Sequence, residues 1–528
     1  MFTDLVATIQ EKWLVLATAL TLAYVATKVR AYLRLRHIPG PPGSGFTDIA
    51  HIRACLGEHA YQWYTSVSDT YGPFARIGPN IVLTSSAEFW ESANAKPGYK
   101  RSEWFYKAAR FDWPHDNVFT SIDVDKHDAK RKMMAPGYSG RENLTLEADV
   151  DSCVAKLLQL VGSYTDDKHT GNGGVFDLGK KLQFMTLDVI GQVGFGKSFG
   201  LLDIDDDPDE FVRSTELGLR RCNQIMSLGI SWINNILVLW SAATADPSKQ
   251  TGFEKMLNIS TNIVEGRERE FRQNLQSKAG GVNERADMLA SFMKNGLLGQ
   301  ELKTEALLQI VAGSDTTAGA LRGTLLYLLT HPRVWRALQE EADAAVRNGT
   351  VPVAGSGDVI SYAQTKNLPY LQAVVREGIR IWPPLTDPFA RDVQPEGDEV
   401  VVDGKKIFLP GGTSVVPSWV SMHRDKSLYG EDVDVFRPER WLESEQPDKE
   451  RLRAMRRTND LMFGHGKFSC LGKPVAMIEI HKTVFELVRN FDMGLINPAK
   501  PWKSASLIGL WVISDMYVHA SRRTPAGV

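Results

Sequence analysis

The chain has 528 residues, 43% of them hydrophobic and 23% charged, which is typical of a folded globular protein with a large core. The formal net charge of -2 argues against nucleic acid as a partner. The chain has four cysteines. They are too widely spaced for a zinc site or a disulfide framework, as expected in a reducing compartment.

The first apolar stretch, Trp13 to Ala26, contains no charged residue, and four basic residues follow it at Lys28, Arg30, Arg34 and Arg36. A spanning helix needs roughly 20 apolar residues, a length reached only by extending the stretch toward Leu5. The basic flank favours the cytosol for the C-terminal side. We therefore predict a single-pass membrane anchor over residues 1–30, and favour it over a buried soluble helix or a cleaved signal peptide.

A proline-rich segment follows the anchor. The run Ile38-Pro39-Gly40-Pro41-Pro42-Gly43 ends the helix, because each proline ring fixes φ and removes a backbone donor. We expect a stiff, basic hinge over residues 31–43 and a folded catalytic domain over residues 44–528.

A basic cluster occupies residues 125–132. His127 and Arg131 are four residues apart and therefore share one face of the predicted helix. Such a charged face is usually solvated, which is the simpler interpretation.

A long helix is predicted from Glu301 to Thr330, because leucines and valines recur at helical spacing and Pro332 follows. Its centre reads Ala312-Gly313-Ser314-Asp315-Thr316-Thr317. Gly, Asp and two Thr together are unusual in a buried helix, which points to chemistry there. The alternative is a helix bend in which the threonines bond back to the helix.

Two charged motifs follow. Glu377 and Arg380 lie three residues apart in the helical pattern from Leu368 to Ile381, which alone is a weak signal. Further along, Arg440 lies in Phe436-Arg437-Pro438-Glu439-Arg440-Trp441.

A cysteine lies in a glycine-rich loop near the C-terminus, in Phe463-Gly464-His465-Gly466-Lys467-Phe468-Ser469-Cys470-Leu471-Gly472. Glycines let the backbone approach a flat ligand closely. The helix predicted from Lys473 to Asn490 would point its N–H groups at the sulfur and favour the thiolate. A thiolate is the axial ligand that haem iron needs for O–O cleavage. A lone cysteine, in contrast, is more often a small buried hydrophobic residue.

Phe463, Gly466, Cys470 and Gly472 match the haem-binding signature of the cytochrome P-450 superfamily, which the chain resembles over nearly its whole length. The resemblance implies a mainly α fold with small β-sheets (α+β) as one large domain after an N-terminal transmembrane helix. The segment Gly464 to Pro474 resembles the pisatin demethylase-like branch of the microsomal fungal enzymes.

This resemblance implies haem b as cofactor, with Cys470 as the metal ligand within a loop that includes Phe463 and Gly466. The stretch around Thr316 looks like the oxygen-activation motif. There Ala312 and Gly313 would leave room for dioxygen, while Thr316 and Asp315 would deliver protons.

The resemblance also assigns the charged motifs. Arg131 and His127 correspond to a pair that binds one haem propionate, and Arg391 to a partner of the second. Glu377, Arg380 and Arg440 would form a buried charge network that holds the cysteine loop against the haem.

One position departs from the family pattern. Two residues before the cysteine the family usually has a basic residue that pairs with a propionate, and here Phe468 stands there. Propionate neutralisation would then rest on Arg131, Arg391 and His127. An aromatic residue is found here in the pisatin demethylase-like branch, so we interpret Phe468 as a feature of the branch.

The activity that this implies is insertion of one atom of O2 into a lipophilic small molecule by hydroxylation or O-demethylation, as in secondary metabolism. Electrons would come from NADPH through a separate flavoprotein, NADPH-cytochrome reductase. The basic segment Lys449 to Arg457 is a candidate docking site for it, although charge runs are usually just solvated. We expect the endoplasmic reticulum membrane as location, with the catalytic domain in the cytosol.

Two other functions remain open at this point. A haem-thiolate isomerase or synthase would need neither O2 nor a reductase. A non-catalytic haem sensor could keep Cys470 but would have no use for Asp315 and Thr316.

Overall fold

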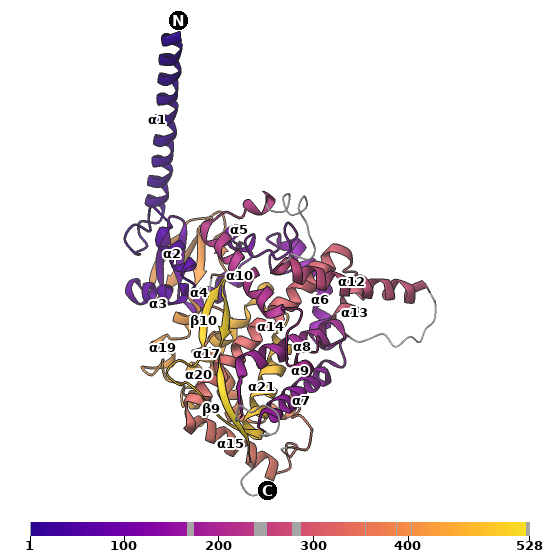
Figure 1. Cartoon of the computed structure of the whole chain (residues 1–528). Helices are drawn as coiled ribbons and strands as arrows, with labels where there is room; N and C mark the ends of the chain where they lie inside the picture. Colours follow the sequence, from indigo (N-terminus) through magenta and orange to yellow (C-terminus); the bar gives the residue numbers. More distant parts are fainter. Residues whose placement is uncertain are drawn as a thin grey trace.

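The computed structural model describes residues 2–165, 174–236, 251–276, 287–353, 355–386, 388–402 and 404–523. The fold is mainly helical with small sheets, as predicted (Figure 1).

The helices of the first half are α1 (Phe2–Arg34), α2 (Ile49–Leu56), α3 (Ala60–Tyr71), α4 (Ala87–Ala95), α5 (Glu103–Tyr106), α6 (Val124–Tyr138), α7 (Leu146–Thr165), α8 (Leu178–Phe195), α9 (Leu201–Ile204), α10 (Phe211–Leu228) and α12 (Phe253–Gln276). Those of the second half are α13 (Met288–Lys294), α14 (Gly299–Thr330), α15 (Pro332–Arg347), α16 (Tyr362–Thr365), α17 (Pro369–Ile381), α18 (Trp419–Met422), α19 (Lys426–Tyr429), α20 (Lys449–Asp460) and α21 (Lys473–Asn490). The part of the chain that the structure describes also has three short 3-10 helices, η2 (Pro438–Trp441), η3 (Leu461–Phe463) and η4 (Gly466–Phe468).

The strands are β1 (Phe74–Gly78), β2 (Ile81–Thr84), β3 (Lys100–Arg101), β4 (Val175–Asp177), β5 (Arg391–Asp392), β6 (Asp398–Val402), β7 (Lys405–Leu409), β8 (Ser414–Pro417), β9 (Phe491–Leu495), β10 (Lys503–Leu507), β11 (Leu510–Ser514) and β12 (Tyr517–Arg522). The largest sheet has the order β1-β2-β8-β5-β3, in which only β2 and β8 run parallel. It brings β3 beside β5 and so places Arg101 opposite Arg391.

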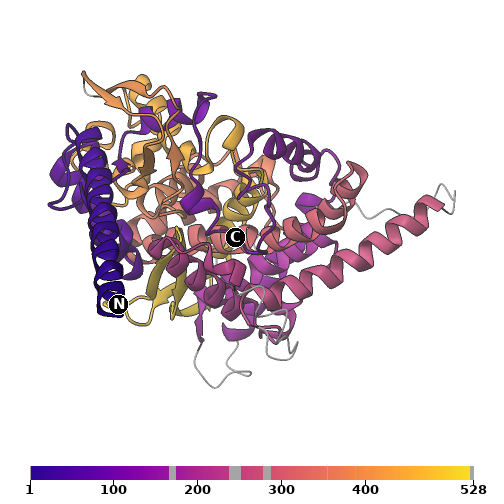
Figure 2. The ribbon, with the colours of Figure 1, turned by 90° about the horizontal axis from the view of Figure 1, so that it is seen from above.

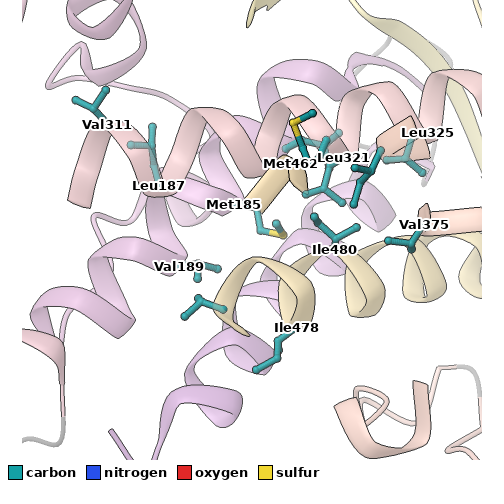
Figure 3. Packing of buried hydrophobic residues seen from close by; sticks show 14 of the residues in the cluster. Met185, Leu187, Val189, Val311, Leu321, Leu325, Val375, Met462, Ile478 and Ile480 are labelled. Carbon is teal, nitrogen blue, oxygen red and sulfur yellow. The ribbon is translucent and has the colours of Figure 1, made fainter. Parts of the chain in front are cut away.

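The core is built around α14, which is buried along most of its length. Leucine, valine and alanine side chains of α14 pack against α8 and α21, whose own apolar residues face it (Figure 3). Removing this much apolar surface from water is the main favourable term in folding. This packed core carries the α14 motif, and α21 carries the cysteine loop at its N-terminal end.

The sequence explains where these helices begin and end. Prolines begin α15 and α17 at their first position, where no backbone donor is needed. Asp123 and Asp448 cap α6 and α20, since each carboxylate accepts two backbone N–H groups of the first turn. The predicted helices over 301–330 and 368–381 are confirmed within two residues at each end.

Helix α1 projects from the body of the protein (Figure 1), and Figure 2 shows it on the side opposite the end of α12. Several large apolar side chains on it are more than 60% exposed, namely Trp13, Val15, Leu20, Leu22 and Tyr24. Its C-terminal end is fixed to β1, because Arg76 donates hydrogen bonds to the carbonyls of Ala31 and Tyr32. Among the described residues no helix is long and apolar enough to cross a bilayer, so the expected spanning anchor is not confirmed.

Candidate active site

The cysteine loop lies between η3 and α21, as the sequence predicts. The backbone N–H of Cys470 donates to the carbonyl of Phe463 at 2.6 Å, which closes the loop. Gly464 has a φ of 72°, and a Cβ there would lie 2.5 Å from the carbonyl oxygen of Phe468. This position therefore requires glycine. Gly466 also has a positive φ, of 59°.

The backbone N–H groups of Gly472 and Lys473, at the start of α21, donate to the Cys470 sulfur. They and the Arg131 guanidinium lower the pKa of the thiol, but burial outweighs them and the pKa is raised. The N–H groups at the start of α21 therefore favour the thiolate, as predicted, while burial acts in the opposite direction. Bound metal would itself deprotonate the thiol. Cys470 lines a cavity of about 700 Å³ together with Phe463, Gly466 and residues of α20 and α21.

Three arginines contact Phe468 or Ser469 of the cysteine loop. The guanidiniums of Arg391 and Arg101 lie 4.4 and 4.8 Å from the centre of the Phe468 ring, distances at which cations and aromatic rings attract. Arg131 donates to the Ser469 carbonyl at 2.5 Å and to the Ser469 hydroxyl at 2.9 Å. Arg131 and Arg391, predicted as partners of the two propionates, therefore both lie at the cysteine loop, and Arg101 lies there too.

These arginines carry charge that the described protein does not neutralise. None of the three guanidiniums forms an ion pair with a carboxylate of the described residues, and Arg101 Nε is buried without a partner. Burial, together with the nearby Arg391 and Arg131, lowers the pKa of Arg101 to about 10. Buried cations need anionic partners. The arrangement thus fits a flat cofactor that carries two carboxylates and whose metal takes a thiolate, which describes haem b.

His127 lies on the same face of α6 as Arg131, and the centre of its ring is 5.6 Å from that of the Phe468 ring. Its Nδ1 lies 2.7 Å from a carboxylate oxygen of Asp128. Burial, and secondly Arg101, lower the pKa of His127 to about 4, although Asp128 raises it. His127 is therefore neutral at pH 7, so it offers a hydrogen-bonding group but no charge to the site.

The central motif of α14 presents one open face within an otherwise buried helix. Ala312 is exposed there and Thr316 is half-buried. The Thr316 hydroxyl donates to the Ala312 carbonyl at 2.9 Å, so the back-bonded arrangement considered above is present, and its oxygen lone pairs stay available as acceptors. Gly313 was expected to make room for dioxygen. A Cβ there would lie 3.0 Å from Ile190 Cδ1, so this glycine also lets α8 approach α14 closely.

Asp315 points to α8, where Gln183 Nε2 donates to its Oδ1 at 2.8 Å. The second carboxylate oxygen is buried and has no partner among the described residues. Burial raises the pKa of Asp315 to about 6, against the opposing effects of Arg322 and Gln183. A carboxyl that titrates near neutral pH suits proton transfer.

Glu377, Arg380 and Arg440 form the buried charge network that the sequence predicts. Arg380 Nε donates to Glu377 Oε2 at 2.8 Å, and Arg440 Nε to Glu377 Oε1 at 3.0 Å, and all three side chains are at most 2% exposed. The opposing arginines lower the pKa of Glu377, although burial alone would raise it. The carboxylate is therefore ionised, and the network joins α17 to η2.

The basic docking segment forms α20. Its arginines divide into two groups. Arg451 donates a hydrogen bond to the Leu428 carbonyl, and Arg456 forms an ion pair with Glu443. Arg453 and Arg457 are exposed and form no ion pair with a described carboxylate, and Arg457 lines the same cavity as Cys470. At least one free basic group of α20, that of Arg457, is thus on the cysteine side of the molecule.

Sequence reasoning missed two residues of this site. Arg101 had no local signal, because only the pairing of β3 with β5 brings it to Arg391. Gln183 had one: it is a buried amide inside the apolar run Leu182 to Met185, where a polar residue needs a partner.

Comparisons with known proteins agree with this geometry. The family model described as Cytochrome P450 matches residues 39–517. The chain is 35% identical to "Cytochrome P450 monooxygenase ABA1" of Pyricularia oryzae, with 97% of both chains covered. It is 33% identical to "Cytochrome P450 monooxygenase aba1" of Botryotinia fuckeliana over 92% of this chain and 91% of the relative. A third relative, "Cytochrome P450 monooxygenase abl1" of Leptosphaeria maculans, is 34% identical, with 94% and 85% covered. We conclude that the chain belongs to the cytochrome P450 family and is a monooxygenase of that family.

Proposed function

We propose that this enzyme inserts one atom of O2 into a lipophilic small molecule of secondary metabolism, by hydroxylation or O-demethylation, with Cys470 as the ligand of haem iron. The observation that carries the proposal is the cysteine loop beside three unneutralised guanidiniums. When bound, haem b supplies the oxygen chemistry and takes its electrons from NADPH through a separate flavoprotein reductase.

The protein's own residues would handle the protons. Thr316 offers its hydroxyl on the open face of α14, and Asp315 holds a carboxyl with a pKa of about 6 one residue away. Gln183 fixes the direction of that carboxyl. An isomerase that uses no O2 consumes no such protons, so this pair supports the monooxygenase.

Aromatic rings beside the arginines support a lipophilic substrate. Phe119 and Phe389 lie 5.7 Å apart, and both pack on Phe105. Phe389 is two residues before Arg391 in the chain. Rings gathered here would favour an apolar molecule through burial of its surface.

The deciding experiment is the carbon-monoxide difference spectrum of the reduced protein, recorded beside Cys470→Ser. We expect a strongly red-shifted Soret band in the wild type and its loss in the variant, because only thiolate ligation shifts the band in this way. An imidazole-type band in the folded wild type, unchanged in Cys470→Ser, would identify a histidine as ligand and end the proposal. NADPH consumption with reductase and O2 then separates a monooxygenase from an isomerase.

The proposal includes location at the endoplasmic reticulum membrane with the catalytic domain in the cytosol. Two features of α1 support this location. Transfer of its exposed apolar side chains from water into a membrane is favourable, and its C-terminal flank is basic. A variant lacking residues 1–30 should stay in solution in a vesicle flotation assay in which the full chain floats. Equal flotation of both would refute the role of α1.

A further inference from the structure

The segment 107–123, between α5 and α6, is held from two sides at one residue. The backbone N–H of Val118 donates to Glu305 Oε1 of α14 at 2.7 Å. The carbonyl of the same residue accepts from Arg101 Nη1 of β3 at 2.8 Å. Both polar groups of one peptide residue are thus engaged by charged side chains that are at most 6% exposed. Hydrogen bonds to charged groups are about twice as strong as those between neutral groups.

Glu305 has a second connection to the segment through Lys130 of α6. The two side chains form a buried ion pair at 3.2 Å, and Lys130 Nζ also donates to the carbonyl of Asp116 at 2.8 Å. Glu305 Oε2 is buried and has no partner among the described residues. Burial raises the pKa of Glu305 to about 7, and Lys130 acts against it. A carboxylate kept in such surroundings needs its ion pair and its backbone donor.

The start of the segment is attached to the same helix. Asp112 Oδ2 accepts from the Thr304 hydroxyl at 2.6 Å and from Gln300 Nε2 at 2.8 Å. The first turns of α14 therefore hold the segment at both Asp112 and Val118.

Val118 adjoins the proposed site on both sides. Arg101, which holds its carbonyl, stacks on Phe468 of the cysteine loop. The next residue, Phe119, packs its ring 5.2 Å from Tyr106 and 5.7 Å from Phe389. A displacement of Val118 would move the Phe119 ring away from its present contacts with Tyr106 and Phe389.

We propose that Glu305 is a positioning residue that fixes segment 107–123, through Val118, and thereby sets the place of the Phe119 ring against Tyr106 and against Phe389, its neighbour among the aromatic rings that the proposed function assigns to the substrate. The contact between Glu305 and Val118 is independent of the reaction, but its meaning for the substrate rests on the proposed function. Arg101 holds the carbonyl of Val118 from the other side and also stacks on Phe468. Val118 is therefore connected to the cysteine loop through Arg101.

The test is amide hydrogen exchange of the full-length holoenzyme, with Glu305→Ala, Glu305→Gln and Glu301→Gln compared to the wild type. Glu301 is the matched control, because it lies on the same helix 3.8 Å from the same Lys130 but its side chain is 64% exposed. We expect Glu305→Ala to speed exchange at Val118 about tenfold or more. Glu305→Gln, which keeps an acceptor for Val118, should restore most of the protection, and Glu301→Gln should match the wild type.

Wild-type exchange at Val118 in Glu305→Ala would overturn the proposal. So would exchange that is faster by the same factor throughout α14 and α21, since that indicates a general loss of stability. If Glu305→Ala does not fold, Glu305→Asp replaces it, because the shorter side chain keeps the charge near Lys130 but draws the carboxylate away from the Val118 N–H. Wild-type exchange at Val118 in Glu305→Asp would then overturn the proposal. Failure of the proposed function would instead appear in the carbon-monoxide spectrum, which this measurement does not use.

Discussion

Glu377→Ala tests the buried charge network most directly. The Glu377 carboxylate is fully buried and accepts hydrogen bonds from Arg380, Arg440, the Arg437 backbone and the Trp441 indole. Without it, Arg380 keeps three backbone carbonyls but loses its carboxylate, whereas Arg440 still contacts Asp432 at 3.1 Å. Uncompensated buried charge of this kind costs about 3–5 kcal/mol.

That cost is a large part of the roughly 5–15 kcal/mol that stabilises a folded domain. We therefore expect Glu377→Ala, and equally Arg380→Ala, to lose bound haem, because the network holds the segment that precedes the cysteine loop. The assay is the Soret absorbance per protein chain, together with thermal unfolding followed by circular dichroism. The control is Lys426→Ala, which removes an exposed ion pair with Glu431 and should leave the unfolding midpoint almost unchanged. If Glu377→Ala matched this control in haem content and unfolding midpoint, the reasoning would be wrong.

Two further predictions concern protons and electrons. Burial raises the pKa of Asp315 to about 6 from an ordinary 3.8, so its ionisation costs the folded state about 3 kcal/mol at pH 7 and nothing below pH 3.8. The free energy of unfolding of the wild type should therefore fall relative to that of Asp315→Asn as pH rises from about 4 to 7. Parallel profiles of unfolding free energy against pH would contradict this assignment. NADPH-driven turnover of Asp315→Asn should drop about 100-fold or more. Reversing Arg453 and Arg457 to Glu should slow reductase-driven turnover at low salt and leave the carbon-monoxide spectrum of the dithionite-reduced protein intact; unchanged turnover would exclude docking at α20.

The parts of the site that the sequence predicted are those whose signal is local. The cysteine loop and the Glu377–Arg380 pair each occupy a few consecutive residues or one helical turn, so their geometry follows from the element that carries them. The α14 motif was located for the same reason, but the close contact of Gly313 with Ile190 of α8 was not. Whether a glycine faces a ligand or a neighbouring helix depends on how α8 packs, which no spacing within α14 encodes.

Residues that act through the tertiary fold could not be found in this way. Arg101 reaches Phe468 only because β3 pairs with β5, and Glu305 reaches Val118 only because segment 107–123 lies against α14. The Cys470 thiol shows the same limit for electrostatics. The N–H groups of α21 point at the sulfur and lower its pKa as predicted, whereas the opposing effect of burial depends on how the surrounding elements pack.

The three guanidiniums at the cysteine loop have a consequence for how the enzyme is made in a cell. They come from β3, α6 and β5, and only the folded chain gathers them, so mutual repulsion opposes their assembly until carboxylates arrive. A cofactor that binds only the folded state stabilises it by mass action, by about 4 kcal/mol at a thousandfold excess over Kd. The yield of folded enzyme is thereby tied to the haem supply of the host, and a host that makes too little haem will accumulate misfolded chain.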